Sequence, residues 1–381
     1  MGLSRYKLGE LIELVNEKNT DGKYDESYVR GVNNRKKLMP TKINLMGRNL
    51  NKFQIVHPGL FVFNHRTSRN GSKFSIACND EKKPIICTED YVVFRVRDNC
   101  KNILNREWLY IFFNRPEFDR FVITNSWGSS TEFYNWENIC DISIDLPPLA
   151  IQQKYVNVYN AMVANQKAYE RGVEDLKLTC DAYIEDLSTC DWHKIGNYIK
   201  RNRKRNQEKK FTKAGVKGFN NDGLFIEPMR LFSGDISTFK IITKNDFVYN
   251  SRINSTIKKL SIVINEAEDV IVSPAYESFY IEKDKELLYP FYLYMLLQRE
   301  SFARKVLFNS FGSSTIVFGF DDLSEIEIPI PSFSEQVAIA NLYKVYKERW
   351  SINEKLKAQI KSICPILIKG SIEEGRNTKE A

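Results

Sequence analysis

The sequence lacks long apolar runs, and this argues against a membrane-spanning helix. No window approaches the roughly 18 uninterrupted apolar residues that such a helix needs. The first ten residues also lack the apolar core and the small-residue cleavage site of a secretory signal. We therefore expect a cytoplasmic protein.

Histidine is scarce and the cysteines are not grouped, which argues against a zinc site or a disulfide framework. The chain has 3 histidines and 7 cysteines, and no cysteine pair forms a CxxC motif. Structural zinc sites usually draw on such pairs or on clustered histidines. The sequence therefore predicts a reduced chain with no metal site.

Motifs of catalysis are missing as well. There is no GxxxxGK[ST] phosphate loop, no GxGxxG dinucleotide turn and no GxSxG nucleophile elbow. Nor is there an Asn-Pro-Pro-aromatic or Asp-Pro-Pro-aromatic tetrapeptide, which an amino-methyltransferase would use to hold its target amine. The nearest nuclease-like group, Asp191 with Glu208-Lys209-Lys210, has no strand context that would support a metal-dependent hydrolase. We expect no catalytic residue and no cofactor in this chain.

The 381 residues suffice for two or three domains, and their charge is uneven. The net charge is +8, and positive residues crowd between positions 200 and 217, where Glu208 is the one acidic residue. Such a run is either a solvated loop or a segment that faces nucleic-acid phosphates. The candidates for phosphate contact in this basic run are Arg201, Arg203, Lys204 and Arg205.

The sequence repeats itself at an offset close to 185 residues. The matched segments are 6–9 and 193–196, 29–34 and 216–221, 61–64 and 247–250, 86–94 and 271–279, 128–131 and 312–315, and 146–147 and 330–331. Their order is kept, and the offset drifts by only a residue or so between neighbouring segments. Since chance does not produce this, the chain is two copies of one unit.

Each copy begins with a compact head of strands and helices. Short apolar or alternating runs, such as 53–56, 60–63 and 91–96, are separated by turn signals such as Pro58-Gly59 and Asn70-Gly71. A helix is expected over 106–121, with its counterpart over 293–306. The last strands are expected over 141–146 and 325–330.

A long amphipathic helix follows each head. Apolar and aromatic residues recur there in steps of four and three, which is the pattern of a coiled coil. Each helix could pack on its own head, but two seams of matching length favour pairing with each other. We expect an antiparallel pair, in which Pro365 kinks or shortens the second helix. The seam residues are Tyr155, Tyr159, Met162, Tyr169, Val173, Leu176 and Tyr183 in the first helix, and Ile339, Tyr343, Tyr346, Trp350, Ile360 and Leu367 in the second.

The predicted fold class is therefore α+β, with two pseudo-two-fold-related α/β domains separated by an antiparallel coiled coil of two long helices. The expected boundaries are 1–148 for the first head, 149–187 for its helix, 188–332 for the second head and 333–370 for its helix. Residues 371–381, charged and without periodicity, are expected to be a disordered tail.

Polar loops of the two heads are the candidate reading surface for DNA. Arginine forks read guanine and asparagine amides read adenine in the major groove. The same residues could simply form turns or cap helices. The candidates are Arg30, Asn33, Asn34, Asn64, Arg66, Arg69, Ser129, Ser130 and Thr131 in the first copy, and Lys217, Asn220, Asn221, Asn250, Arg252, Ser313, Ser314 and Thr315 in the second.

With these features the sequence resembles the specificity (S) subunits of type I restriction–modification systems, from residue 6 to about residue 370. The resemblance rests on the duplicated plan and on the segment 146–154 (LPPLAIQQK), which leads into the first long helix. Its counterpart 330–336 (IPSFSEQ) departs from this pattern at the second proline. The segments 125–131 (NSWGSST) and 309–315 (NSFGSST) also look like the family's late head loop.

The resemblance implies that the heads are two target recognition domains, each reading one half of a split, asymmetric DNA sequence. The helices would set the gap between the half-sites and dock two methyltransferase (M) subunits, which are joined by two restriction (R) subunits. S-adenosylmethionine and ATP with magnesium would belong to those partners. The complex would then be an adenine-N6 DNA methyltransferase and ATP-dependent endonuclease, and this chain its non-catalytic reader.

Two other functions stay open at this point. The chain could be the recognition part of a single-polypeptide restriction–methylation enzyme, or a non-catalytic scaffold whose heads bind proteins. A methyl-transfer assay with the chain alone distinguishes the first alternative from a non-catalytic subunit. Steeply salt-dependent DNA binding argues against the second.

Overall fold

The computed structural model describes residues 2–41, 44–66, 73–127, 132–187, 190–228, 234–253, 260–282, 287–308 and 316–378. The chain divides into a first unit, Met1–Glu170 with Ile352–Ala381, and a second unit, Arg171–Ser351. Each of the two long helices, α5 (Leu149–Asp186) and α9 (Phe333–Asn377), contributes one part to each unit.

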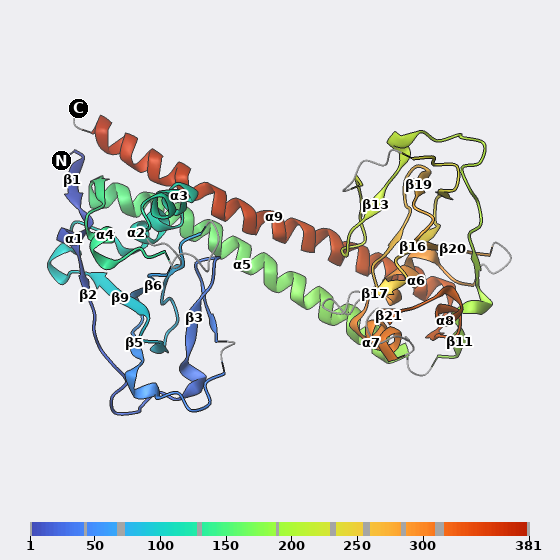
Figure 1. The fold of residues 1–381 in the computed structure, drawn as a ribbon, viewed down its shortest axis with the longest axis horizontal. Helices are drawn as coiled ribbons and strands as arrows, with labels where there is room; N and C mark the ends of the chain where they lie inside the picture. The colour runs from blue at the N-terminus through green and yellow to red at the C-terminus, as the bar shows by residue number, and fades with distance from the viewer. Residues whose placement is uncertain are drawn as a thin grey trace. The chain divides into compact units, whose positions relative to one another are not determined.

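The first unit is built around a four-stranded antiparallel sheet in the order β2-β9-β6-β7 (Figure 1). Three further antiparallel pairs, β1 with β10, β3 with β4 and β5 with β8, complete its strands. The strands are β1 (Ser4–Lys7), β2 (Ile12–Leu14), β3 (Arg30–Val32), β4 (Leu38–Pro40), β5 (Gln54–Val56), β6 (Phe61–Asn64), β7 (Ile76–Cys78), β8 (Ile85–Cys87), β9 (Tyr91–Val96) and β10 (Ser143–Leu146). The short helices are α1 (Leu8–Leu11), α2 (Arg106–Phe113), α3 (Pro116–Thr124) and α4 (Trp136–Cys140).

The second unit repeats this plan. Its four-stranded sheet has the order β12-β20-β16-β18, and the pairs β11 with β22, β13 with β14 and β15 with β19 match those of the first unit. The strands are β11 (Trp192–Lys194), β12 (Ile199–Arg201), β13 (Gly218–Phe219), β14 (Phe225–Ile226), β15 (Lys240–Ile242), β16 (Phe247–Tyr249), β17 (Arg252–Ile253), β18 (Ile262–Ile264), β19 (Val270–Val272), β20 (Glu277–Ile281), β21 (Ile316–Val317) and β22 (Glu327–Pro329). The short helices are α6 (Pro290–Leu297), α7 (Glu300–Phe308) and α8 (Phe320–Ser324).

Strand alternation explains how each sheet forms a core on both faces. In β6, Phe61 and Phe63 point into the large core beneath the helices, and Val62 points into a smaller cluster on the other face. Phe61 stacks on Phe94 at a centroid distance of 5.0 Å, and the equivalent rings Phe247 and Phe279 stack at 4.7 Å. The repeated sequence therefore gives a repeated core.

A glycine repeated in sequence has a structural reason. A Cβ added at Gly9 would lie 2.8 Å from the Cβ of Cys140, and one added at Gly196 would lie 2.9 Å from the Cβ of Ser324. The first turn of each head thus packs directly against a short helix, α4 or α8, at a distance that only glycine allows.

The helix expected over 106–121 is in fact two helices. α2 ends at Phe113, and Pro116 occupies the first turn of α3, where its missing N–H costs nothing. The counterpart is likewise divided into α6 and α7. The apolar pattern continued across the break because both short helices bury one face in the same core.

Within the first unit, α5 and α9 run antiparallel. The ammonium of Lys154, near the start of α5, lies 2.8 Å from Glu374, near the end of α9. Further along, the Nε2 of Gln166 donates to the Oδ1 of Asn353 at 3.1 Å. In the second unit, Ile184 of α5 packs in the same core as residues from the start of α9. The predicted fold class, with two related α/β domains and antiparallel pairing of the long helices, is confirmed.

The helix seam departs from the expected pattern at two positions. Tyr183 is 55% exposed, and the neighbouring Ile184 packs on the core in its place. Trp350 is 37% exposed. A helix has 3.6 residues per turn, so a 3.5-residue stripe drifts around it and shifts by one position over several turns. The other seam residues are buried or half-buried: Tyr155, Tyr159, Met162, Tyr169, Val173, Leu176, Ile339, Tyr343, Tyr346, Ile360 and Leu367.

The expectation of a disordered tail from residue 371 is wrong for the part that is described. α9 continues through Pro365 to Asn377. Ser371 is fully buried and accepts a hydrogen bond of 3.0 Å from the indole N–H of Trp108, and a Cβ added at Gly375 would lie 2.9 Å from Pro147. The small residues of this segment let the helix pack closely on the first head, a tertiary contact that its charged composition hides. Neither long helix, nor any other in the described ranges, is apolar enough over its length to span a bilayer.

A buried glutamine joins each long helix to its head. The Oε1 of Gln152 accepts from the backbone N–H of Asn105, and its Nε2 donates to the carbonyls of Ile103 and Pro147, all at 2.8 Å. Both Gln152 and its counterpart Gln336 are fully buried.

Gln336 makes the same three bonds in the second unit, to Tyr289, Leu287 and Pro331 at 2.7–2.9 Å. At the start of α9, Ser332 stands where the first copy has Pro148, and its hydroxyl and N–H donate to Glu335, which closes a capping box. These bonds lower the pKa of Glu335.

We predict that Gln152→Leu lowers the free energy of unfolding of the first unit by about 2–3 kcal/mol, because three backbone groups lose their buried partner. Gln336→Leu should do the same to the second unit. Urea denaturation followed by circular dichroism measures the loss. The neighbouring exposed Gln153→Leu is the control, and equal losses in all three variants would contradict this role.

Candidate nucleic-acid interface

The hairpin between β3 and β4 carries the first group of candidate residues. The Oδ1 of Asn33 accepts from the N–H groups of Arg35 and Lys37 at 2.8 and 3.1 Å, so its amide oxygen builds the turn. Arg30 donates to the carbonyl of Ser27 at 2.7 Å, and its guanidinium is partly held within the head. Asn34 is exposed at the tip of the hairpin.

The second unit holds the equivalent loop in the same way. The Oδ1 of Asn220 accepts from the N–H groups of Asp222 and Leu224 at 3.1 and 3.0 Å. Lys217 forms an ion pair with Glu227, and Asn221 accepts from the hydroxyl of Ser261. The turn interpretation therefore accounts for the side-chain oxygens of Asn33 and Asn220, because both accept hydrogen bonds from the backbone of their own loops.

A second candidate surface lies where β6 ends. The Oδ1 of Asn64 accepts from the N–H of Arg66 at 3.0 Å, which turns the chain at the strand end, and Arg66 is partly buried there. Arg66 contacts Asp90 at 3.3 Å and pairs as a β-bridge with Phe133. The ring of Phe133 lies 5.4 Å from that of His65.

The end of β16 repeats this arrangement with different side chains. The Oδ1 of Asn250 accepts from the N–H of Arg252 at 3.0 Å, and Arg252 pairs with Val317 of β21. The N–H of Phe318 donates to the carbonyl of Ser251 at 2.8 Å, as the N–H of Tyr134 donates to that of His65. Both units therefore present an arginine on the same backbone frame, which we call the arginine turn.

Sequence reasoning missed the aromatic residues of the first arginine turn. Trp127 is 76% exposed and forms a two-bonded β-bridge with Phe133. Burial lowers the pKa of His65, so its ring is neutral at pH 7. Phe133 and Val317 are equivalent positions, and their difference makes the two surfaces chemically unlike. The place of Trp127, directly before the repeated Gly-Ser-Ser-Thr segment, was the available signal.

Seven predicted contact residues lie outside the described residues. They are Arg69, Ser129, Ser130, Thr131, Ser313, Ser314 and Thr315.

Two buried asparagines fix the backbone conformation of the basic run through hydrogen bonds. Asn202 donates to the carbonyl of Ile241 at 2.8 Å, and Asn206 both accepts from and donates to the backbone of Phe211 at 3.0 Å. Asn19 in the first unit makes the same pair of bonds to Tyr24. These asparagines were not singled out from sequence, because a buried amide and a surface amide look alike in a polar loop.

The cations of the basic run differ in their partners. Arg201 lies 3.6 Å from Asp321 and 4.9 Å above the ring of Phe320, and Arg205 donates to the carbonyl of Lys204 at 3.2 Å. Arg203 and Lys204 have exposed side chains. The run thus combines an arginine held by Asp321 and Phe320 with two exposed cations, and arginine and lysine are residue types that commonly contact phosphates.

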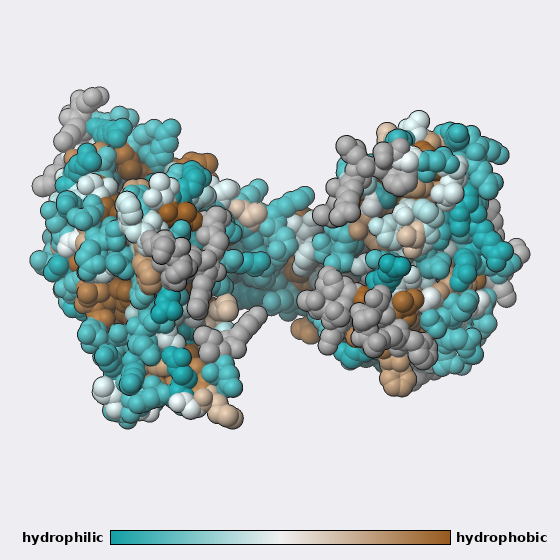
Figure 2. Space-filling model, viewed as in Figure 1, coloured by the Kyte–Doolittle hydropathy of each residue, from teal (hydrophilic) through white to brown (hydrophobic). Residues whose placement is uncertain are grey.

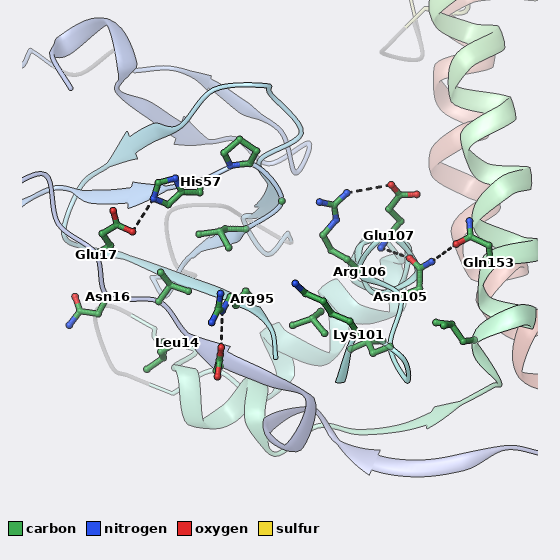
Figure 3. Close-up of a pocket in the computed structure, with 18 residues that line it drawn as sticks. Leu14, Asn16, Glu17, His57, Arg95, Lys101, Asn105, Arg106, Glu107 and Gln153 are labelled. Atoms are coloured by element: carbon green, nitrogen blue, oxygen red, sulfur yellow. Dashed lines mark hydrogen bonds and ion pairs between the residues drawn. The ribbon is translucent and has the colours of Figure 1, made fainter. Parts of the chain in front are cut away.

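A cleft of about 1080 Å³ lies beside the sheet edge of the first unit (Figure 3). Its charged side chains pair with one another: Arg95 with Glu13 at 2.7 Å and Arg106 with Glu107 at 3.4 Å. His57 shares a hydrogen bond of 2.9 Å with Glu17. Because these pairs cancel, the cleft has no strong charge. Within the described ranges, no three His, Cys, Asp or Glu side chains are grouped to hold a metal ion.

The visible surface is mostly hydrophilic, with scattered apolar residues in place of one broad patch (Figure 2). A polar surface with arginine and aromatic residues at strand ends can contact nucleic acid, through charge at the phosphates and through hydrogen bonds at the bases.

The chain is similar to known proteins in sequence and in fold. Residues 184–362 match the family described as the type I restriction modification DNA specificity domain. The fold matches the S subunit of a type I restriction–modification system from M. genitalium over 97% of this chain and 96% of that one, with 12% identity and a TM-score of 0.58. No curated protein gives a sequence match.

Two other solved chains are similar at lower scores. HsdS from Thermoanaerobacter tengcongensis is 14% identical, covers 97% of this chain and 96% of its own, and has a TM-score of 0.38. A chain from a structure of complex assembly and conformational transition in the type I R-M system is also 14% identical, with 98% and 97% covered and a TM-score of 0.49. Residues 184–362 thus match the type I DNA specificity family, and nearly the whole chain has the fold of an S subunit of a type I restriction–modification system.

Proposed function

We propose that this chain selects the DNA target of a type I complex by reading two unlike half-sites, one with each head. The observation that carries the proposal is the arginine turn, which recurs on the same backbone frame in both units with different neighbours. A shared frame would present a cation to a base edge in each head, and the unlike neighbours Phe133 and Val317 would favour different sequences. The expected target is therefore asymmetric.

In this proposal the chain itself carries out no reaction. Two methyltransferase subunits would bind S-adenosylmethionine and methylate adenine at N6, and two restriction subunits would use ATP with magnesium to cleave. The basic run would contact backbone phosphates and the head loops the bases. The complex would act in the cytoplasm, where the DNA is.

The direct test is to express the chain with the methyltransferase subunit of the same system and map adenine methylation across genomic DNA. We expect one two-part motif with an unread spacer, and its loss when this chain is omitted. Methylation that persists without the chain would reject the proposal. Methyl transfer by the chain alone would favour a single-chain enzyme.

We predict that Arg66→Ala and Arg252→Ala each weaken discrimination at one half-site only. Loss of a base contact costs about 1–3 kcal/mol, or roughly tenfold to a hundredfold in preference for the cognate base. Competition binding with duplexes altered in one half-site measures this. Arg5→Ala, an exposed arginine on β1, is the control. If either variant changed both half-sites, independent reading by the two heads would be wrong.

We also predict that exposed apolar residues of the long helices dock the methyltransferase subunits. Leu178 of α5 is 67% exposed and Ile366 of α9 is 63% exposed. Leu178→Asp and Ile366→Asp should weaken co-purification by roughly tenfold or more without unfolding the chain, because a charge replaces buried apolar contact. Leu287→Asp, 64% exposed on the second head, should leave assembly unchanged. Full assembly in both helix variants would place docking elsewhere.

A further inference from the structure

A buried ion pair lies beneath the β3–β4 hairpin of the first unit. Lys36 has a left-handed backbone, with φ at +59°, and its side chain is 3% exposed. Its ammonium lies 2.7 Å from the Oδ1 of Asp119 on α3 and also donates to the carbonyl of Phe113. The turn does not need a lysine for its shape, since the equivalent left-handed residue in the second unit is Gly223. The side chain of Lys36 therefore has a role beyond the turn.

The carboxylate of Asp119 makes two contacts in this arrangement. The same Oδ1 that contacts Lys36 also accepts from the N–H of Phe74 at 3.1 Å, and Asp119 is 5% exposed. Lys36 neutralises its charge at contact distance. Asp119 thus holds two chain segments together, and with Lys36 it forms a pair of no net charge.

Three further cations surround this pair, and they come from three separate segments. Arg35 directly precedes Lys36 in the hairpin, and Lys73 directly precedes Phe74, so the contacts of Asp119 bring both segments to one place. Lys361 lies on α9, one turn before Cys364, which belongs to the same core as Phe118 beside Asp119. Among the described residues, no carboxylate lies within 4.0 Å of the charged groups of these three.

The pKa of Lys361 also indicates that these three cations lie near one another. Burial lowers the pKa of Lys361, and Lys73 and Arg35 lower it further, whereas Asp119 acts in the opposite direction. Two ammonium groups so placed repel each other, and a shared anion between them removes the repulsion.

We propose that Arg35, Lys73 and Lys361 form a binding site for a phosphate of the DNA backbone, seated on the Lys36–Asp119 pair. This rests on the proposed function. Arg35 and Lys361 are exposed and Lys73 is half-buried, so a phosphate can reach all three. An arginine fork and two ammonium groups match the oxygens of a phosphate. The site lies beside the hairpin tip with Asn34, so the phosphate contact would fix the position of that loop on the duplex.

The test is the double variant Lys73→Met with Lys361→Met in the full-length chain. Each phosphate contact contributes about 0.9 to the slope of log affinity against log salt concentration. We expect the slope to fall by about 0.9, for the loss of one phosphate contact, and the affinity at fixed salt to fall roughly tenfold, equally for cognate and unrelated duplexes. The control, Lys52→Met with Lys355→Met, makes the same charge change at two exposed lysines of this unit. A slope equal to that of the control would overturn the site.

A second measurement separates DNA from free anion and from a folding defect. Inorganic phosphate, compared with chloride at equal ionic strength, should raise the unfolding midpoint of the wild type and of the control more than that of the double variant. Stabilisation by phosphate without a change in DNA slope would assign the site to a free anion and overturn the DNA role. A wild-type chain that binds duplex without salt dependence would contradict the proposed function itself, whereas a changed slope at an unchanged midpoint in chloride supports the site.

Discussion

The buried glutamine at the start of each long helix is the interaction on which the rest of the structure depends. In each unit its amide joins three backbone groups: one before the short helix α2 or α6, one at its cap and one at the last strand. A buried amide whose hydrogen bonds are all satisfied allows one geometry, since any shift leaves polar groups unpaired in the core. The direction in which each helix leaves its head is fixed in this way. The proposed function depends on that constraint, because each recognition surface must keep a fixed position on the helix that leaves its own head.

The two heads combine a constant frame with variable surfaces. The equivalent sheets, the aromatic stacks Phe61–Phe94 and Phe247–Phe279, and the asparagine turns at the ends of β6 and β16 are shared. The side chains around those turns are not. Buried positions in the two copies must satisfy the same packing, whereas exposed positions can differ freely. This difference is what the proposed function requires, because one frame then reads two unlike half-sites.

Local sequence patterns predicted some elements well and others poorly. The run 91–96 is a strand over its whole length, since its alternation matches the two faces of a sheet. The helix expected over 106–121 is broken, because periodicity alone does not show where a chain turns between two helices that share a core. The exposed Tyr183 reflects the slow rotation of a heptad stripe around a real helix. The tail was misjudged because Ser371 and Gly375 pack by being small, and small residues carry no apolar signal.

The sequence by itself determined the duplication, the class of fold and the resemblance to type I specificity subunits, because repeated motifs and helical periodicity are properties of residue order. Only the tertiary structure decided which polar residues form hydrogen bonds within a head and which are exposed. Asn33 and Asn34 are neighbours in one motif, yet one builds the turn and the other is exposed. Lys36 and Asp119 meet across the head, and the cations gathered around them come from segments far apart in the chain. A side chain's partners depend on which segments folding brings together, and that information lies in the packing of the core.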